Sequence, residues 1–436
     1  MLRNILLTCF LCFGYQVLWS DSLQVVRGDV EEGQWTVVRE FPQKSYPRFV
    51  PAGNYSGITH LHDDVYAVVS DKSDSVLFFK FRIQVDELTG ELRHVENLGY
   101  DVMVDGSRYD GKSWIGRDMG FDHEAIAKVS DSTLMVASEG FFSIREFFIN
   151  PSSRNAEWNS RLRKIECPSA AFAPNYAFES LAFDSVRHYL WTIPESTLRK
   201  DGEPATPQNG GANKLRLMRI DIGDLKGIDA QHLEGIDVLR QNSDDSDSVN
   251  VGGKHFMEAY AYRMDKPTTN KKAETYVMGV SELCVLPDGQ LLVLEREAFI
   301  PRMKLGAFCK CKLYLINLLQ ENPYPIEQPF CEATPYINKH LLLEWKTGLS
   351  VFDRSFANYE GMCLGPKLKN GDQVVILLSD SQDQYAGVLK DWFKTVVVRE
   401  IRNEKLEMRA VGDTKKVRKT SHELLRTFNV IFPNFS

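Results

Sequence analysis

The sequence predicts an all-β fold, a β-propeller of six blades, with five or seven blades as alternatives. Three observations support this prediction. A hairpin-like unit recurs along the chain, a third strand follows every copy, and helical periodicity is nowhere sustained over the 436 residues. With 43% hydrophobic residues, the chain can bury a core of the size that such a domain needs.

The repeated unit opens with Ser or Glu, followed by a small or polar residue and an aliphatic residue. The openings are Ser56-Gly57-Ile58, Glu124-Ala125-Ile126, Glu179-Ser180-Leu181, Ser281-Glu282-Leu283 and Glu360-Gly361-Met362. Each copy closes with an apolar run that ends in a pair containing a charged residue. These pairs are Ser70-Asp71, Ser138-Glu139, Pro194-Glu195, Glu295-Arg296 and Ser379-Asp380. Turn formers such as Asp63-Asp64 lie between the two halves, which predicts a β-hairpin for each copy.

A third strand, rich in β-branched and aromatic residues, follows each hairpin. These strands are predicted at Val76–Ile83, Ile144–Ile149, Leu215–Ile220, Leu313–Ile316 and Thr395–Ile401. The widest gap between copies could hold a degenerate sixth blade, with Glu258–Met264 as one of its strands. A strand at Gln34–Glu40 could close the ring by pairing with late strands. We therefore assign residues 35–402 to a propeller domain and 403–436 to a C-terminal tail.

Residues 1–20 have the features of a secretory signal peptide: Arg3, the apolar run Ile5–Phe13 and the small residue Ser20. We therefore expect a secreted or periplasmic protein. An uncleaved N-terminal anchor is the alternative, because Leu18 is larger than the small residue that usually stands two positions before the cut. No later stretch has the ~20 apolar residues that a membrane-spanning helix requires, so the mature chain should be soluble.

The formal net charge of −7 argues against a nucleic-acid partner, because neutralising phosphates requires a concentrated basic surface. A small anionic ester is the expected ligand, and a monomer the expected state. Disulfides are possible in an exported chain. Cys284 and Cys363, however, occupy matching places in two repeats, each inside an apolar run, which favours buried free thiols.

Hairpin topology should bring the acidic residues of the repeats together. The start of the first strand and the end of the second lie at the same edge of a hairpin, and ring symmetry places every copy at one mouth. The predicted acidic rim consists of Asp71, Glu124, Glu139, Glu179, Glu195, Glu282, Glu295, Glu360 and Asp380. Crowded carboxylates repel unless a cation lies between them, and hard oxygen ligands suit Ca²⁺. The alternative is that each acid accepts hydrogen bonds from the backbone of a neighbouring blade.

Several fragments of the repeats occur in a specific order and spacing. They are Tyr55-Ser56-Gly57-Ile58, Ala137-Ser138-Glu139-Gly140, Phe178–Phe183, Val280-Ser281-Glu282-Leu283, Leu291–Arg296, Glu360-Gly361-Met362 and Ser379-Asp380. Over residues 45–402 this pattern resembles the phytase-like domain family, known for esterase-like activity of phytase. The resemblance implies an exported propeller comparable to calcium-dependent phytases. It implies no settled catalytic motif, and the departures at Pro194 and Arg296 suggest less metal ligation in those two blades.

The expected function is Ca²⁺-assisted hydrolysis of phosphate esters at the propeller mouth. The predicted catalytic residues are Glu139, Glu179 and Glu360. The predicted metal ligands are Asp71, Glu124, Glu195, Glu282, Glu295 and Asp380. Lys72, His123, Arg145 and Arg296 are the predicted contacts to an anionic substrate. The alternatives are hydrolysis of a lactone or carboxyl ester on the same metal, and a non-catalytic binding or scaffolding propeller.

Overall fold

The structure is a computed structural model of the whole chain. It describes residues 34–73, 76–103, 122–140, 142–149, 164–166, 169–173, 176–223, 250–251, 254–255, 257–319, 321–382 and 389–401. The chain divides into two compact units, Trp35–Arg399 and the terminal segments Met1–Gln34 with Glu400–Ser436. The predicted signal peptide and C-terminal tail lie outside the described residues. Within the described ranges, no helix combines the length and apolar character needed to cross a membrane.

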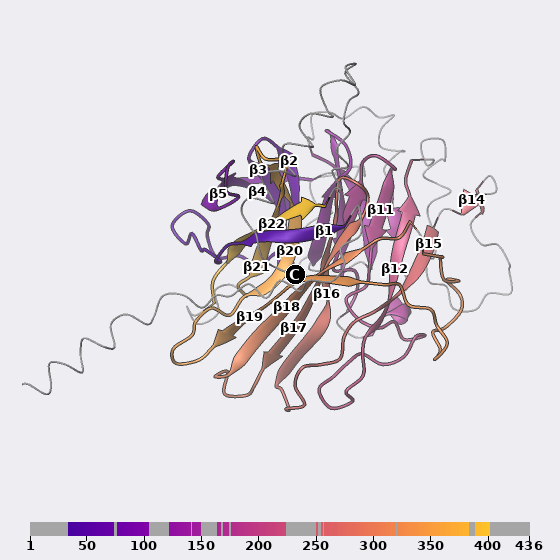
Figure 1. Cartoon of the computed structure of the whole chain (residues 1–436). Helices are drawn as coiled ribbons and strands as arrows, with labels where there is room; N and C mark the ends of the chain where they lie inside the picture. Colours follow the sequence, from indigo (N-terminus) through magenta and orange to yellow (C-terminus); the bar gives the residue numbers. More distant parts are fainter. Residues whose placement is uncertain are drawn as a thin grey trace, which may run out of the picture. The chain divides into compact units, whose positions relative to one another are not determined.

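Antiparallel sheets of four strands dominate the described part of the chain (Figure 1). Sheet 1 contains β2 (Tyr55–His62), β3 (Val65–Ser70), β4 (Leu77–Val85) and β5 (Leu92–Val102), and sheet 2 contains β6 (His123–Lys128), β7 (Thr133–Ser138), β8 (Ser143–Phe148) and β9 (Lys164–Glu166). Sheet 3 contains β10 (Ala182–Asp184), β11 (Tyr189–Thr192), β12 (Lys214–Asp221) and β15 (Met257–Arg263). Sheet 4 contains β16 (Thr275–Val285), β17 (Leu291–Ile300), β18 (Ala307–Ile316) and β19 (His340–Leu349). Sheet 5 contains β20 (Asn358–Lys367), β21 (Gln373–Asp380), β22 (Phe393–Glu400) and β1 (Trp35–Glu40).

Three short described elements lie outside these sheets. The strands β13 (Asn250–Val251) and β14 (Lys254–His255) pair with each other, and η2 (Ser169–Ala171) is a 3₁₀ turn. None of the three takes part in the repeated hairpins.

The predicted hairpins and third strands are confirmed in all five repeats, because the first three strands of each sheet pair in chain order. The predicted pairing of the N-terminal strand with late strands is confirmed as well: β1 lies beside β22 in sheet 5. The proposed degenerate blade around Glu258–Met264 is wrong. That segment is β15, which pairs with β12 and completes sheet 3. The described residues therefore contain five four-stranded sheets and not six.

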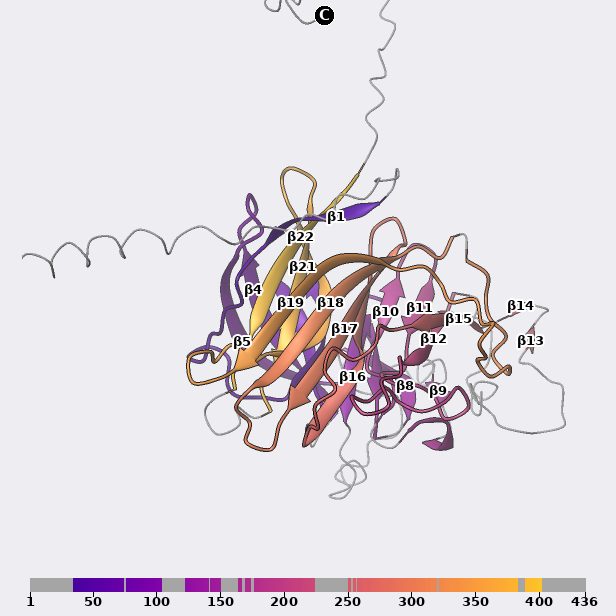
Figure 2. The ribbon, with the colours of Figure 1, turned by 60° about the horizontal axis from the view of Figure 1, so that its bottom comes forward.

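The leading strands β2, β6, β10, β16 and β20 contact one another in the cyclic order of sheets 1, 2, 3, 4, 5 and 1. Figure 2 shows the sheets from a second side. The backbones approach closely where these strands meet. A Cβ atom on Gly361 would lie only 2.4 Å from the backbone oxygen of Ser56, so this position requires glycine.

Apolar side chains fill the space between each sheet and the next, as the alternation of inward and outward residues on a strand requires. Representative buried pairs are Val69 with Val136, Ala125 with Leu190, Leu217 with Val293, Leu313 with Val375, and Tyr66 with Ile376, each pair drawn from one core cluster. Burial of this apolar surface is the main stabilising contribution to the packing of sheet on sheet.

The five described cysteines are free thiols. Cys284 and Cys363 are buried, as their apolar surroundings predicted, and so are Cys309 and Cys311. Cys331 is exposed. No disulfide therefore contributes to the described fold, which depends on sheet pairing and on the packed cores.

Candidate functional site

Each leading strand carries one extra residue at the same place in the hairpin. In sheet 2, His123 pairs with Ser138 and Ala125 with Ala137, so Glu124 is the extra residue of a β-bulge. The same register shift occurs between Tyr55 and Ile58, between Val280 and Glu282, and between Tyr359 and Gly361. In sheet 3, residues 179–181 oppose only residues 192–193, between the pairs Phe178–Pro194 and Ala182–Trp191. A bulge re-aims a side chain, and this one sets Ser56, Glu124, Glu179, Ser281 and Glu360 in equivalent positions.

The second strand of each hairpin supplies a further side chain at the same edge. The backbone N–H of Asp71 donates to the carbonyl of Asn54 over 3.1 Å, and that of Glu139 donates to the carbonyl of Asp122 over 2.9 Å. By this register, the equivalent positions in the five sheets hold Asp71, Glu139, Glu195, Arg296 and Asp380. Four repeats thus present an acid where sheet 4 presents an arginine.

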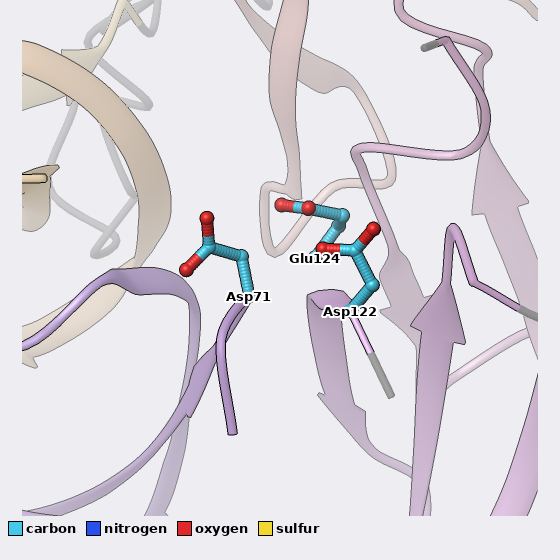
Figure 3. Close-up of side chains that lie close together, drawn as sticks. All are labelled: Asp71, Asp122 and Glu124. Atoms are coloured by element: carbon cyan, nitrogen blue, oxygen red, sulfur yellow. The ribbon is translucent and has the colours of Figure 1, made fainter. Parts of the chain in front are cut away.

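Sheets 1 and 2 together form a group of carboxylates that we call the acidic cluster, consisting of Asp71, Asp122, Glu124 and Glu139. Carboxylate oxygens of Asp71, Asp122 and Glu124 lie within 4.8 Å of one another (Figure 3). The same holds for Glu124, Glu139 and Glu179. Glu124 therefore belongs to both groups, and the hydroxyl of Ser56 donates to its Oε2 over 2.9 Å.

Sheets 3, 4 and 5 form a second group, the arginine cluster, which consists of Arg296, Glu179, Glu195 and Glu360. The Nη2 atom of Arg296 lies 2.8 Å from Oε1 of Glu195 and 3.6 Å from Oε2 of Glu179. Its Nη1 atom contacts Glu360 and donates to Oδ1 of Asn358 over 3.0 Å. Burial disfavours the charge of Arg296, but Glu360, Glu195 and Glu179 outweigh that effect and raise its pKa well above the usual value.

Burial, followed by repulsion between neighbouring acids, raises the pKa values of Glu124, Glu139 and Glu179. For Glu139 the two effects raise the pKa to about 7, with Asp122, Glu195 and Asp71 as the repelling neighbours. The pKa values of Glu124 and Glu179 are raised well above the ordinary range for the same reasons. In the metal-free protein these groups therefore hold protons at a pH where exposed carboxyl groups are ionised.

Most of the predicted rim is gathered at this edge. Asp71, Glu124, Glu139, Glu179, Glu195, Glu360 and Arg296 belong to the two clusters. Asp380 adjoins them, because it pairs across the hairpin with Asn358, and burial and then the charge of Glu360 raise its pKa. Lys72 lies at the exposed side of the acidic cluster, with Nζ 3.8 Å from Asp71 and 2.9 Å from Oδ1 of Asn54.

Two predicted ligands, Glu282 and Glu295, point elsewhere. The bulge in sheet 4 falls on Ser281, so Glu282 occupies the next position along the strand and accepts a hydrogen bond of 3.0 Å from the backbone N–H of Leu181. This is the blade-to-blade contact that the sequence analysis set against the metal hypothesis. Glu295 accepts hydrogen bonds of 2.6 Å from the hydroxyl of Tyr262 and from Lys339.

Two predicted substrate contacts also lie away from the carboxylates. His123 is buried at the position that precedes the bulge, where the other repeats have Tyr55, Phe178, Val280 and Tyr359. Its ring packs edge-on against Phe147, and burial lowers its pKa to about 3. Arg145 lies on β8, the third strand of sheet 2, and donates to the hydroxyl of Ser143 over 3.1 Å.

The sequence analysis missed Asp122, Asn358 and Tyr176. A signal existed for the first two, because Asn54, Asp122 and Asn358 all stand two residues before the Ser or Glu that opens the repeat. Tyr176 carries no such signal, since it precedes β10 in a loop. Burial and then the charge of Glu195 raise the pKa of Tyr176 to about 12, with Glu179 and Glu139 also nearby.

Comparisons with known proteins identify the family, and the fold similarities are remote. A catalytically inactive virginiamycin B lyase from Staphylococcus aureus, solved with quinupristin, is 10% identical with a TM-score of 0.29, over 84% of this chain and 100% of that one. The WD40 domain of SCAP from fission yeast is 11% identical with a TM-score of 0.20, over 78% and 72%. Drosophila Semaphorin 1b, extracellular domains 1–2, is 10% identical with a TM-score of 0.24, over 84% and 80%.

No curated protein matches the chain. The family model Phytase-like, described as "Esterase-like activity of phytase", matches residues 50–382. This range contains all five hairpins and both carboxylate groups, so the match covers the candidate site itself. The chain belongs to the phytase-like family.

Proposed function

We propose that this protein is a Ca²⁺-assisted hydrolase of small phosphate esters, built as a five-bladed β-propeller with its reaction centre at the acidic cluster. The single observation that carries the proposal is that Glu124 belongs to two groups of three carboxylates. In each group, one oxygen of every residue lies within 4.8 Å of the others. Their separation is short enough for several carboxylates to share one ion.

The donor set fits a hard divalent cation. All candidate ligands in the acidic cluster are carboxylates, and they come from two neighbouring sheets. Ca²⁺ accepts six to eight oxygens in flexible geometry, whereas Mg²⁺ usually keeps more of its own water, so carboxylates grouped in this way favour Ca²⁺. Asp71, Asp122, Glu124 and Glu139 would hold the ion, with Glu179 at the border of the arginine cluster. When bound, Ca²⁺ supplies a Lewis acid for a phosphoryl oxygen.

The chain's own residues supply the remaining functions. Glu139 is half-buried, and its pKa is raised to about 7 in the metal-free protein, so it would release its proton near neutral pH when the cation binds. Lys72 is half-exposed beside Asp71, which suits a contact to the non-reacting oxygens of an anionic ester. Tyr176 adds a protonated phenol near Glu139 and Glu195.

A hydrolysis assay with and without metal tests the proposal. The full chain is incubated with p-nitrophenyl phosphate, phytate or p-nitrophenyl acetate, in added Ca²⁺ and in chelator. We expect turnover of the phosphate esters in Ca²⁺ and its loss in chelator. Glu124→Gln should abolish it, because both oxygen groups depend on Glu124. The matched control is Glu87→Gln, an equal change at a carboxylate that is 68% exposed and lies in a hairpin turn.

The same assay separates the alternatives. Turnover of p-nitrophenyl acetate alone would favour a carboxyl-ester or lactone hydrolase; the family description names an esterase-like activity. No turnover under any condition would leave a binding or scaffolding role. Export and a monomeric state remain part of this proposal, and they can be checked by N-terminal sequencing of the secreted protein and by light scattering.

A further inference from the structure

Arg296 stands at a position that the other four repeats fill with acids. The register places it level with Asp71, Glu139, Glu195 and Asp380. Across the hairpin it pairs with Gly279, where a Cβ atom would lie 2.4 Å from Cγ of Glu195. The absent side chain of Gly279 thus leaves room for Glu195 beside the guanidinium.

The guanidinium of Arg296 supplies positive charge that would otherwise have to come from a bound cation. Its two terminal nitrogens contact Glu360 on sheet 5, Glu179 at the start of the hairpin of sheet 3 and Glu195 at the end of that hairpin. With only 5% of its side chain exposed, it is poorly accessible to a substrate. A rigid planar cation with several donors is suited to bridging carboxylates in this way.

The acidic cluster differs in its source of positive charge. Lys72 lies beside it, with Nζ 3.8 Å from Asp71 and a side chain that is 50% exposed. A half-exposed lysine compensates repulsion between the carboxylates less well than a buried guanidinium, so this cluster is the better place for a cation from solution.

We infer that Arg296 is a positioning residue that takes the place of a second metal ion and confines Ca²⁺ to the acidic cluster. This inference rests on the proposed function, since it concerns the number and place of the ions at the same site. It also reassigns Arg296, which the sequence analysis expected to contact substrate. The site should accordingly bind one Ca²⁺, and removal of the arginine charge should open a second site at Glu179, Glu195 and Glu360.

Equilibrium dialysis of the full chain against radioactive Ca²⁺ at pH 8 measures the number of ions bound. We expect one ion for the wild-type chain and two for Arg296→Gln. The matched control is Arg399→Gln. Arg399 makes two hydrogen bonds to Asp372, and its side chain is 54% exposed. That variant should still bind one ion. If Arg296→Gln fails to fold, the double variant Arg296→Gln/Glu360→Gln, which leaves the net charge of the cluster unchanged, should bind the second ion.

The outcomes separate the inference from the proposed function. One ion in the wild type and still one in every folded Arg296 variant would overturn the inference and leave the metal centre standing. Two ions in the wild type would also overturn it. No ion in the wild type but one in Arg296→Gln would overturn the proposed metal centre and support the role of the arginine. No ion in either protein would overturn both.

Discussion

In the arginine cluster, carboxylates from two sheets share one buried guanidinium held at fixed distances. In the acidic cluster, carboxylates from two neighbouring sheets lie within 4.8 Å of one another, and the half-exposed Lys72 lies beside Asp71. Both groups are built from the same repeated positions, and the difference follows from one residue of sheet 4. The comparison shows that a repeat protein can relieve like-charge repulsion within the chain in one region, and we propose that a ligand relieves it in the other.

The largest effect is expected from a mutation that breaks the arginine cluster. Arg296→Gln leaves buried carboxylates without their counter-charge, so the metal-free protein should lose about 3–5 kcal/mol of unfolding free energy at pH 8. At pH 5 the loss should be smaller, because carboxyl groups with raised pKa values then take up protons. Urea unfolding at the two pH values measures both quantities. The exposed control Arg399→Gln should cost at most about 1 kcal/mol, and an equal loss in both variants would contradict the special role of Arg296.

The next largest effect is expected in the acidic cluster, where removal of a charge should not lower the stability of the metal-free protein. Glu124→Gln relieves burial and repulsion of a carboxylate, so the metal-free protein should be at least as stable as the wild type at pH 8. Its affinity for Ca²⁺ should fall by more than about 100-fold, since even indirect supports of a metal site cost about 10–100-fold. Titration calorimetry and thermal unfolding test the two statements. Unchanged affinity would remove Glu124 from the proposed ligands.

A smaller effect is expected from pH. Protons compete with the cation for Glu139, whose pKa is raised to about 7 in the metal-free protein. Affinity for Ca²⁺ should therefore rise between pH 6 and pH 8, by at most about tenfold per unit for one released proton. The metal-free protein should correspondingly lose stability as the pH rises from the ordinary glutamate range through about 7. Glu139→Gln should flatten both profiles in this window, and a profile that Glu139→Gln leaves unchanged would assign the proton to another group.

The smallest effect is expected at the rim. Lys72→Gln removes one half-exposed charge beside Asp71 and Asn54. The KM for a phosphate ester should rise about fivefold, the equivalent of one hydrogen bond, while the number of bound Ca²⁺ ions stays the same. Steady-state kinetics at saturating Ca²⁺ measure this. A fall in kcat with unchanged KM would show that Lys72 acts on the reaction and not on binding.

Much of the fold could be read from the local pattern of the sequence. The openings and closing pairs of the repeats predicted every hairpin, because strand alternation and turn residues are properties of neighbouring positions. The sixth blade failed for a non-local reason. Nothing near Glu258–Met264 shows that β15 joins β12 across the residues between them.

The sequence by itself determined that acids recur at the ends of the hairpins and that these ends share an edge. Only the tertiary structure decided which of them meet, because a bulge of one residue directs Glu124 and Glu360 into the site and leaves Glu282 on the backbone of the neighbouring sheet. It also decided that Arg296 contacts acids of the two flanking sheets. The physical reason is that strand periodicity is encoded locally, whereas contact between charges depends on the packing of one sheet against the next.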